Sequence, residues 1–134
     1  MMRQYALEQI AGLLTRLAAE VDHAKSVQDP DAVHDLRVTI RRFGRSLRAF
    51  SPYIPDRAVT RIRKQLRHIM DLTGEVRNRD ITMELLEKAE TAEPLQAVRS
   101  DREFAMRILL SELDRWHVEN EAVRWRAALE LPSL

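Results

Sequence analysis

The sequence predicts an all-α protein, an antiparallel bundle of four to five helices. Apolar residues recur at intervals of three and four positions along most of the chain, and no segment alternates apolar and polar residues as a strand does. The composition agrees, because 45% hydrophobic and 32% charged residues with only 3 Gly and 5 Pro are unlike a disordered or turn-rich β chain. At 134 residues, the chain is expected to form a single domain, residues 1–134, around one core.

The first helix is expected from about Arg3 to Lys25. Its apolar face consists of Leu7, Ile10, Leu14, Leu17 and Val21. A second helix should begin at Asp29-Pro30, because aspartate caps a helix N-terminus and proline suits the first helical position. Pro52 and Pro55 should end this second helix.

Asp56 is predicted to cap a third helix, which we expect to break at Thr73-Gly74. A fourth helix then carries Ile81, Leu85 and Leu86, and Glu93-Pro94 marks the turn that follows. Because the connections between these segments are short, neighbouring helices should run antiparallel.

The segment from about Leu95 to Glu130 is expected to form one long helix or two short ones. Its apolar residues fall on two faces, one of which contains Trp125. Two interpretations remain open. In the first, the helix bends near Glu119-Asn120 and both faces pack internally. In the second, one face is a subunit interface, where aromatic residues are favoured.

The composition also excludes several kinds of protein. The chain has no Cys, which rules out disulfides, thiolate zinc sites, iron–sulfur clusters and a cysteine nucleophile. No apolar run approaches the roughly 18 residues that span a bilayer, and the first residues lack the apolar core of a secretory signal. We therefore expect a soluble, cytoplasmic protein with no membrane partner.

Catalytic and metal-binding motifs do not stand out. His34 has no second histidine or acid at ligand spacing, and no glycine-rich phosphate loop or nucleophile motif occurs. Asp80 and Glu84 lie one helical turn apart, and we expect them to pair with Arg77 or Arg79 rather than to act as acid and base. The sequence predicts no metal, no cofactor and no enzymatic activity.

Positive charge is concentrated in the middle of the chain. Between His34 and Arg79 there are twelve arginines and lysines against four acidic residues, although the formal net charge of the whole chain is only +1. At 100° per residue, one face of the predicted second helix, about 80° wide, carries five basic side chains. They are His34, Arg37, Arg41, Arg45 and Arg48, while Arg42 stands apart from them.

The predicted third helix carries a similar row of basic residues. Arg57, Arg61, Lys64 and His68 are spaced by four, three and four residues and therefore share a face. Together the two rows could line one groove. The alternative is that each row is a solvated helix face, but the near absence of interleaved acids in the row on the second helix argues against this alternative.

The residue types favour a ligand rich in phosphate. Arginines outnumber lysines 19 to 3, and a guanidinium group presents a planar pair of donors that matches phosphate oxygens. No aromatic residue that could stack on bases belongs to the row on the second helix. Three classes of function remain open: a non-enzymatic polyanion-binding module, a sequence-independent nucleic-acid-binding protein and an enzyme acting on phosphorylated substrates.

Two segments of the chain carry a distinctive motif. Residues 33–42 read Val-His-Asp-Leu-Arg-Val-Thr-Ile-Arg-Arg and are followed by Arg45, Phe50 and Pro52, and residues 72–81 read Leu-Thr-Gly-Glu-Val-Arg-Asn-Arg-Asp-Ile. Together they cover about residues 30–87 and resemble the CHAD family, the conserved histidine α-helical domains. The resemblance implies a helical domain that binds inorganic polyphosphate without catalysis and is associated with polyphosphate granules.

The resemblance also implies which residues bind the ligand. His34, Arg37, Arg41, Arg42, Arg45 and, further along, Arg77 match the basic positions of the family motif. Other members of the two basic rows complete the candidate set. The candidate polyphosphate-binding residues are His34, Arg37, Arg41, Arg42, Arg45, Arg48, Arg61, Lys64, His68 and Arg77.

Two features depart from the family pattern. Asn78 stands where the family usually has an aspartate, which would be a stronger anchor for Arg77 than a neutral amide. Family members usually contain two helical halves in tandem, whereas this sequence contains one. The resemblance therefore implies one half of the usual arrangement and a homodimer that restores the pair, since two-fold symmetry is the commonest way to do so.

Overall fold

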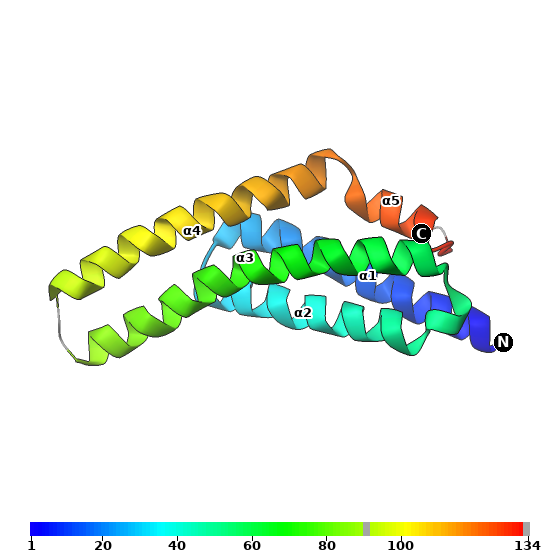
Figure 1. The fold of residues 1–134 in the computed structure, drawn as a ribbon, viewed down its shortest axis with the longest axis horizontal. Coiled ribbons are helices and arrows are strands. Elements are labelled where there is room, and N and C mark those ends of the chain that lie inside the picture. Colours follow the sequence, from blue (N-terminus) through cyan, green and yellow to red (C-terminus); the bar gives the residue numbers. More distant parts are fainter. Residues whose placement is uncertain (90–91, 133–134) are drawn as a thin grey trace.

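The computed structural model describes residues 1–89 and 92–132, and in this part of the chain it contains helices and no strand. The helices are α1 (Met2–Val27), α2 (Pro30–Ala49), the 3-10 turn η1 (Ser51–Tyr53), α3 (Asp56–Lys88), α4 (Ala92–Val118) and α5 (Glu121–Ala128) (Figure 1). The predicted all-α class and the predicted number of helices are confirmed.

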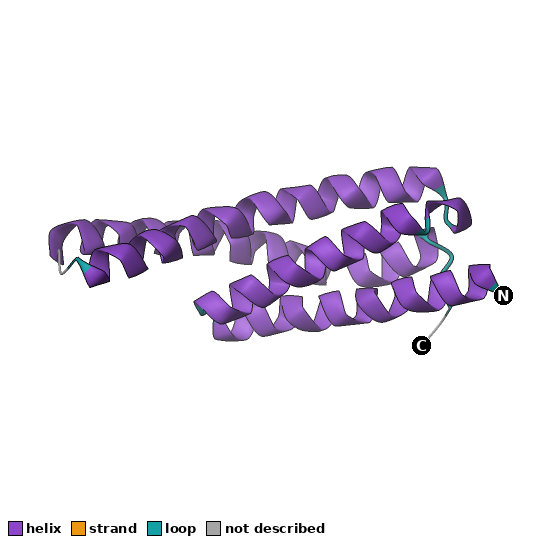
Figure 2. Ribbon diagram, turned by 90° about the horizontal axis from the view of Figure 1, so that it is seen from below, coloured by secondary structure: helices purple, strands orange, loops and turns teal. Residues whose placement is uncertain are grey.

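The four long helices run up and down, each beside the next in the sequence. α1 packs against α2, α2 against α3, and α3 against α4, while the short α5 contacts α1, α3 and α4. At about 1.5 Å per residue, α3 is about 50 Å long and α2 about 30 Å. The far ends of α3 and α4 therefore extend beyond α1 and α2 as a projecting hairpin (Figures 1 and 2).

The start of α2 follows the prediction and the start of α3 does not. Asp29 caps α2 by accepting a hydrogen bond from the backbone N–H of Ala32 at 2.8 Å, with Pro30 as the first helical residue. By contrast, the cap position of α3 is Pro55, and Asp56 is already inside the helix and makes no capping bond. Asp56 instead lies in the first turn, where its negative charge interacts favourably with the positive end of the helix dipole.

The predicted break at Thr73-Gly74 is wrong, because α3 continues through it to Lys88. The predicted fourth helix is thus the second half of α3. Gly74 has a negative φ, so it does not form a turn. Its lack of a side chain instead allows close packing against Arg37 of α2. The predicted turn at Glu93-Pro94 is also wrong, since both residues lie in the first turn of α4, where proline is tolerated.

The bend predicted near Glu119-Asn120 is present and divides α4 from α5. Asn120 adopts the left-handed conformation, φ 53° and ψ 46°, which asparagine tolerates better than most residues. The reversal folds α5 back onto the bundle and places the Trp125 side chain in the core, where only 3% of the residue is exposed. The alternative in which the face containing Trp125 forms a subunit interface is therefore wrong.

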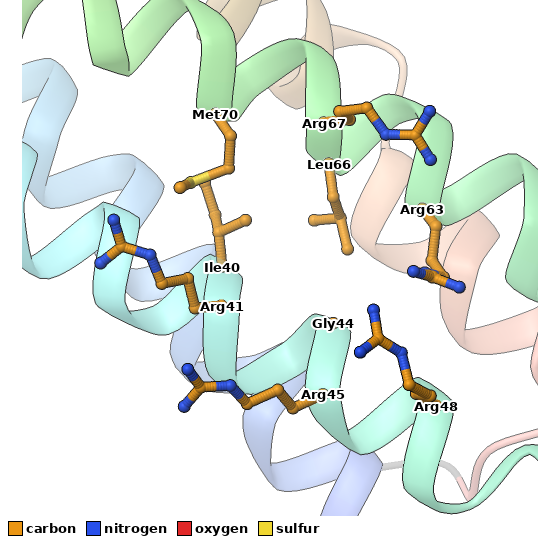
Figure 3. A pocket seen from close by; sticks show the side chains of 9 residues that line it. All are labelled: Ile40, Arg41, Gly44, Arg45, Arg48, Arg63, Leu66, Arg67 and Met70. Atoms are coloured by element: carbon orange, nitrogen blue, oxygen red, sulfur yellow. The ribbon is translucent and has the colours of Figure 1, made fainter.

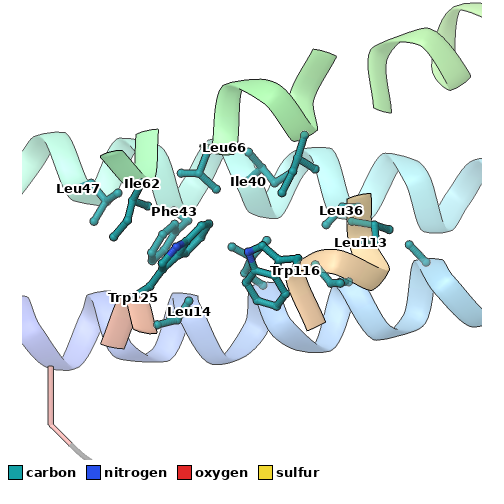
Figure 4. Packing of buried hydrophobic residues seen from close by; sticks show 14 of the residues in the cluster. Leu14, Leu36, Ile40, Phe43, Leu47, Ile62, Leu66, Leu113, Trp116 and Trp125 are labelled. Atoms are coloured by element: carbon teal, nitrogen blue, oxygen red, sulfur yellow. The ribbon is translucent and has the colours of Figure 1, made fainter. Parts of the chain in front are cut away.

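Aromatic packing joins α5 to the other helices (Figure 4). Trp125 stacks on Phe43 of α2, with ring centroids 6.0 Å apart, and meets Trp116 of α4 edge to face at 5.5 Å. The Trp125 indole N–H donates to Gln65 Oε1 at 2.9 Å, and the Gln65 amide donates to the buried carboxylate of Glu121 at 2.6 Å. These contacts satisfy polar groups that would otherwise be buried without partners.

Candidate functional site

An open groove lies between α2 and α3, with a cavity volume of about 260 Å³. Its lining residues are Ile40, Arg41, Gly44, Arg45 and Arg48 from α2 and Arg63, Leu66, Arg67 and Met70 from α3 (Figure 3). Ile40 and Leu66 are buried and form an apolar floor. Gly44 adds no side chain above this floor, and the space that a Cβ atom would occupy there has no neighbouring atom within 4 Å.

The five arginines of the groove have no ion-pair partner within residues 1–89 and 92–132. Other arginines of the chain do pair with carboxylates, as Arg115 does with Glu112 and Glu119. In Figure 3 the guanidinium groups of Arg48 and Arg63 reach toward each other from opposite walls. The groove therefore concentrates uncompensated positive charge, which attracts anions.

The α2 wall of the groove contains part of the predicted row. Arg41, Arg45 and Arg48 line the groove together. His34 is exposed near the start of α2 and does not line the cavity, and Arg42 is exposed and likewise stands outside it. The structure thus brings three of the six predicted basic residues of α2 into one wall.

Arg37 occupies a different environment, because it is half-buried against α3. Its Nη1 donates hydrogen bonds to the Met70 carbonyl oxygen at 2.8 Å and to Thr73 Oγ1 at 2.9 Å. A Cβ atom on Gly74 would lie 3.1 Å from the same Nη1, so the glycine makes room for the guanidinium group. Arg37 therefore joins α2 to α3 directly beside the groove.

Burial and like charges disfavour the ionised form of Arg37. Its pKa is lowered first by burial and then by the neighbouring guanidinium groups of Arg41 and Arg77, with a smaller opposing effect from Asp71. The Nε atom is buried and has no hydrogen-bond partner in the described part of the chain. An arginine nonetheless stays charged at neutral pH, so Arg37 and Arg77 extend the positive potential beyond the end of the groove.

The α3 wall differs from the prediction. Arg63 and Arg67 line the groove, and neither belonged to the predicted set. At 100° per residue, the predicted residues Arg61, Lys64 and His68 lie about 100° to 160° around the helix from Arg63. The expectation that both predicted basic rows line one groove is therefore wrong.

The predicted α3 residues have other neighbours. Arg61 lies beside Gln65 and Glu121, on the side of α3 that faces α5. His68 faces α4, with its Nε2 atom 3.9 Å from the Glu112 carboxylate. Lys64 is exposed beside Arg57.

Arg63 and Arg67 were missed because both sides of the buried face of α3 carry basic residues. Each follows a core residue, Ile62 or Leu66, by one position, and Arg61 precedes one in the same way. The spacing is therefore the same on both sides. Only the side on which α2 packs distinguishes them, and that is a property of the tertiary structure.

Asp80 and Glu84 have cationic partners other than the predicted ones. The Asp80 carboxylate pairs with Arg102 of α4 at 2.5 Å, and Arg102 also donates to the Gln28 carbonyl oxygen at the end of α1. Glu84 pairs with Lys88 of its own helix. Asp80 thus anchors the base of the projecting hairpin rather than orienting Arg77 or Arg79.

Residues 1–89 and 92–132 contain neither a cluster of metal ligands nor a helix that could span a membrane. No group of three His, Cys, Asp or Glu side chains lies close enough together to hold a metal ion. None of the helices there has both the length and the apolar character needed to cross a membrane.

Comparison with known proteins identifies the family of the chain. No curated protein and no solved structure shows a significant match to the chain. The sequence profile of the CHAD domain matches residues 8–134, a longer stretch than the two motifs in α2 and α3. The match thus also includes most of α1 and all of α4 and α5. Because it covers nearly the whole chain, the protein belongs to the CHAD domain family.

Proposed function

We propose that the protein binds inorganic polyphosphate in the α2–α3 groove and, through this ligand, associates with polyphosphate granules in the cytoplasm. The observation that carries the proposal is the groove itself, in which five arginines from two helices surround an apolar floor. These arginines have no ion-pair partner in the part of the chain that the structure describes. Arginine forks bind phosphate oxygens through two parallel hydrogen bonds, and each contact releases a counterion from the polymer.

The lining favours a phosphate chain over a nucleic acid. Proteins that bind single-stranded nucleic acids usually add aromatic side chains on which the bases stack. The nine lining residues include no aromatic side chain, and the nearby Phe43 is fully buried. Sequence-independent nucleic-acid binding through phosphates remains the second candidate function, supported by the same arginines.

The lining also favours binding without catalysis. Hydrolysis or phosphoryl transfer requires a group that activates a nucleophile or donates a proton to the leaving group. The groove is lined by arginine, aliphatic, methionine and glycine residues, which supply neither. We therefore propose that the protein holds polyphosphate and does not cleave it.

A competition titration tests these proposals. The protein is titrated with short polyphosphate and separately with single-stranded RNA of equal charge, and each bound ligand is then challenged with the other. We expect polyphosphate to displace RNA at far lower concentration than the reverse, to raise the melting temperature and to yield no free phosphate. Tighter RNA binding would support the second candidate, and phosphate release would contradict the absence of catalysis.

We further propose that the chain forms a homodimer, as the tandem arrangement of the family implies. The face around Trp125 does not provide the dimer interface, because Trp125 is buried within the chain. The projecting hairpin provides another apolar surface, since Ile81 is 42% and Leu85 61% exposed on α3. Contiguous exposed apolar surface is typical of protein–protein interaction sites.

Light scattering tests the dimer. We expect a mass of twice 15.6 kDa for the natural sequence and of one chain for Leu85→Glu. Val123→Glu, at a residue 63% exposed on α5, is the control and should leave the mass unchanged. A natural sequence that remains monomeric with and without polyphosphate would disprove the dimer.

A further inference from the structure

A second set of basic residues begins where the groove ends. Lys64, Arg61 and Arg57 follow groove residue Arg67 at steps of three, three and four positions back along α3, so each is a surface neighbour of the next. We call Arg57, Arg61 and Lys64 the outer row. All three are exposed, and with Asp56 and Thr60 they line a broad surface depression.

The outer row is as uncompensated as the groove. Its three side chains form no ion pair with any residue among 1–89 and 92–132. Asp56 is the one acidic residue of the depression. Beyond Arg61, a further hollow includes Arg124 of α5, which is paired with the buried carboxylate of Glu121 at 3.7 Å. Uncompensated positive charge therefore continues from the groove across α3 as far as Arg61.

The path of these charges is strongly curved. At 100° per residue, a path over the surface of α3 turns through about 160° around the helix axis if it passes Arg63, Arg67, Lys64 and Arg61 in that order. A helix with its side chains is only about 10–12 Å across, so a ligand that follows this path must bend within that diameter. Duplex DNA is far too stiff to do so, because its persistence length is about 50 nm. A single polyphosphate chain, linked by freely rotating P–O–P bonds, meets the requirement.

We propose that the outer row is an extension site, occupied by those polyphosphate chains that are too long for the groove alone. This inference rests on the proposed function, since it assumes that the groove holds the first part of the chain. The α2 wall from Arg41 to Arg48 rises about 10 Å, and the outer row adds about 15 Å between Arg67 and Arg57. Affinity and salt dependence should therefore increase with chain length and reach a limit when both parts are filled.

The test compares short and long polyphosphate on a variant in which the outer row is neutralised, Arg57→Gln, Arg61→Gln and Lys64→Gln. The short chain is no longer than the groove wall, and the long chain exceeds both parts together. For the long chain, we expect the slope of log affinity against log salt to fall by about 2, given about 0.7 per released counterion on a single strand. For the short chain, we expect no change in slope.

A second triple variant serves as the control for net charge. Arg16→Gln, Arg99→Gln and Arg107→Gln remove the same number of positive charges from exposed positions on α1 and α4. This control should leave the slope for the long chain unchanged, because none of these residues adjoins the groove. Circular dichroism checks that both variants are folded.

The outcomes separate the inference from the proposed function. If the natural sequence fails to bind the short chain, the groove proposal itself is wrong. If the short chain binds but the outer-row variant keeps the full slope for the long chain, the extension site is disproved while the groove stands. Equal binding of duplex DNA and of long polyphosphate would also overturn the inference, because a duplex cannot follow the curved path.

Discussion

Replacing Arg41, Arg45 and Arg48 together with glutamine is expected to lower the affinity for short polyphosphate by about 100-fold, which corresponds to about 2.8 kcal/mol. These residues form the whole basic content of the α2 wall. Each one lost removes charge-assisted hydrogen bonds to phosphate and a released counterion, so the salt dependence should flatten as well. Titration at several salt concentrations measures both effects.

The same triple variant should fold as stably as the natural sequence, or slightly more so. The three guanidinium groups have no ion-pair partner in residues 1–89 and 92–132, and like charges one turn apart on a helix repel. Arg42→Gln is the matched control on α2, since Arg42 lies outside the groove, and its affinity should change little. A folded triple variant that binds polyphosphate normally would show that the groove is not the site.

The second large effect is expected for Arg37→Met, which should lower the free energy of unfolding by about 2 kcal/mol, the usual range for hydrogen bonds of a charged group. The substitution removes two hydrogen bonds that join α2 to α3, and these outweigh the relief from repulsion by Arg41 and Arg77. Arg45→Met is the control. It changes the same helix without breaking a protein hydrogen bond and should stay within about 0.5 kcal/mol.

Gly74 provides a sharper test of the same contact. Replacing a helical glycine with alanine normally stabilises a helix by about 1 kcal/mol. In this protein the new Cβ atom would lie only 3.1 Å from Arg37 Nη1. Gly74→Ala should therefore raise the free energy of unfolding by clearly less than about 1 kcal/mol in the natural sequence, and by the full amount in the Arg37→Met background. Urea unfolding of the four proteins measures the coupling. Additive effects would mean that Arg37 does not depend on the space left by the glycine.

The structural role of Arg37 explains a difficulty in choosing site residues from sequence alone. On the helical wheel, Arg37 and Arg41 are equivalent members of one basic row. In the folded chain Arg37 donates to Met70 and Thr73, more than thirty residues away in the sequence, whereas Arg41 lines the groove. The wheel records direction around one helix and carries no information about which neighbouring helix lies there.

The local signal at the start of α2 was reliable. Asp29-Pro30 defines the start of α2, because both the capping bond and the proline preference involve only adjacent residues. The break predicted at Thr73-Gly74 was wrong because the glycine serves a contact with a residue distant in the sequence. Its lack of a side chain leaves room for the guanidinium group of Arg37. A glycine inside a helical pattern thus has two interpretations that sequence alone cannot separate.

The order in which the helices pack also has a kinetic consequence. Most tertiary contacts join helices that are consecutive in the chain, and helical domains with such short contact separations fold within microseconds to milliseconds. The contacts of α4 and α5 with α1 are among the exceptions, and they bring the two ends of the chain together. Closing that long loop costs chain entropy, and only the contacts of the completed core offset this cost. We therefore expect the pairing of α2 with α3 to precede the docking of α5, so that the arginine-lined groove exists before Trp125 is buried in the core.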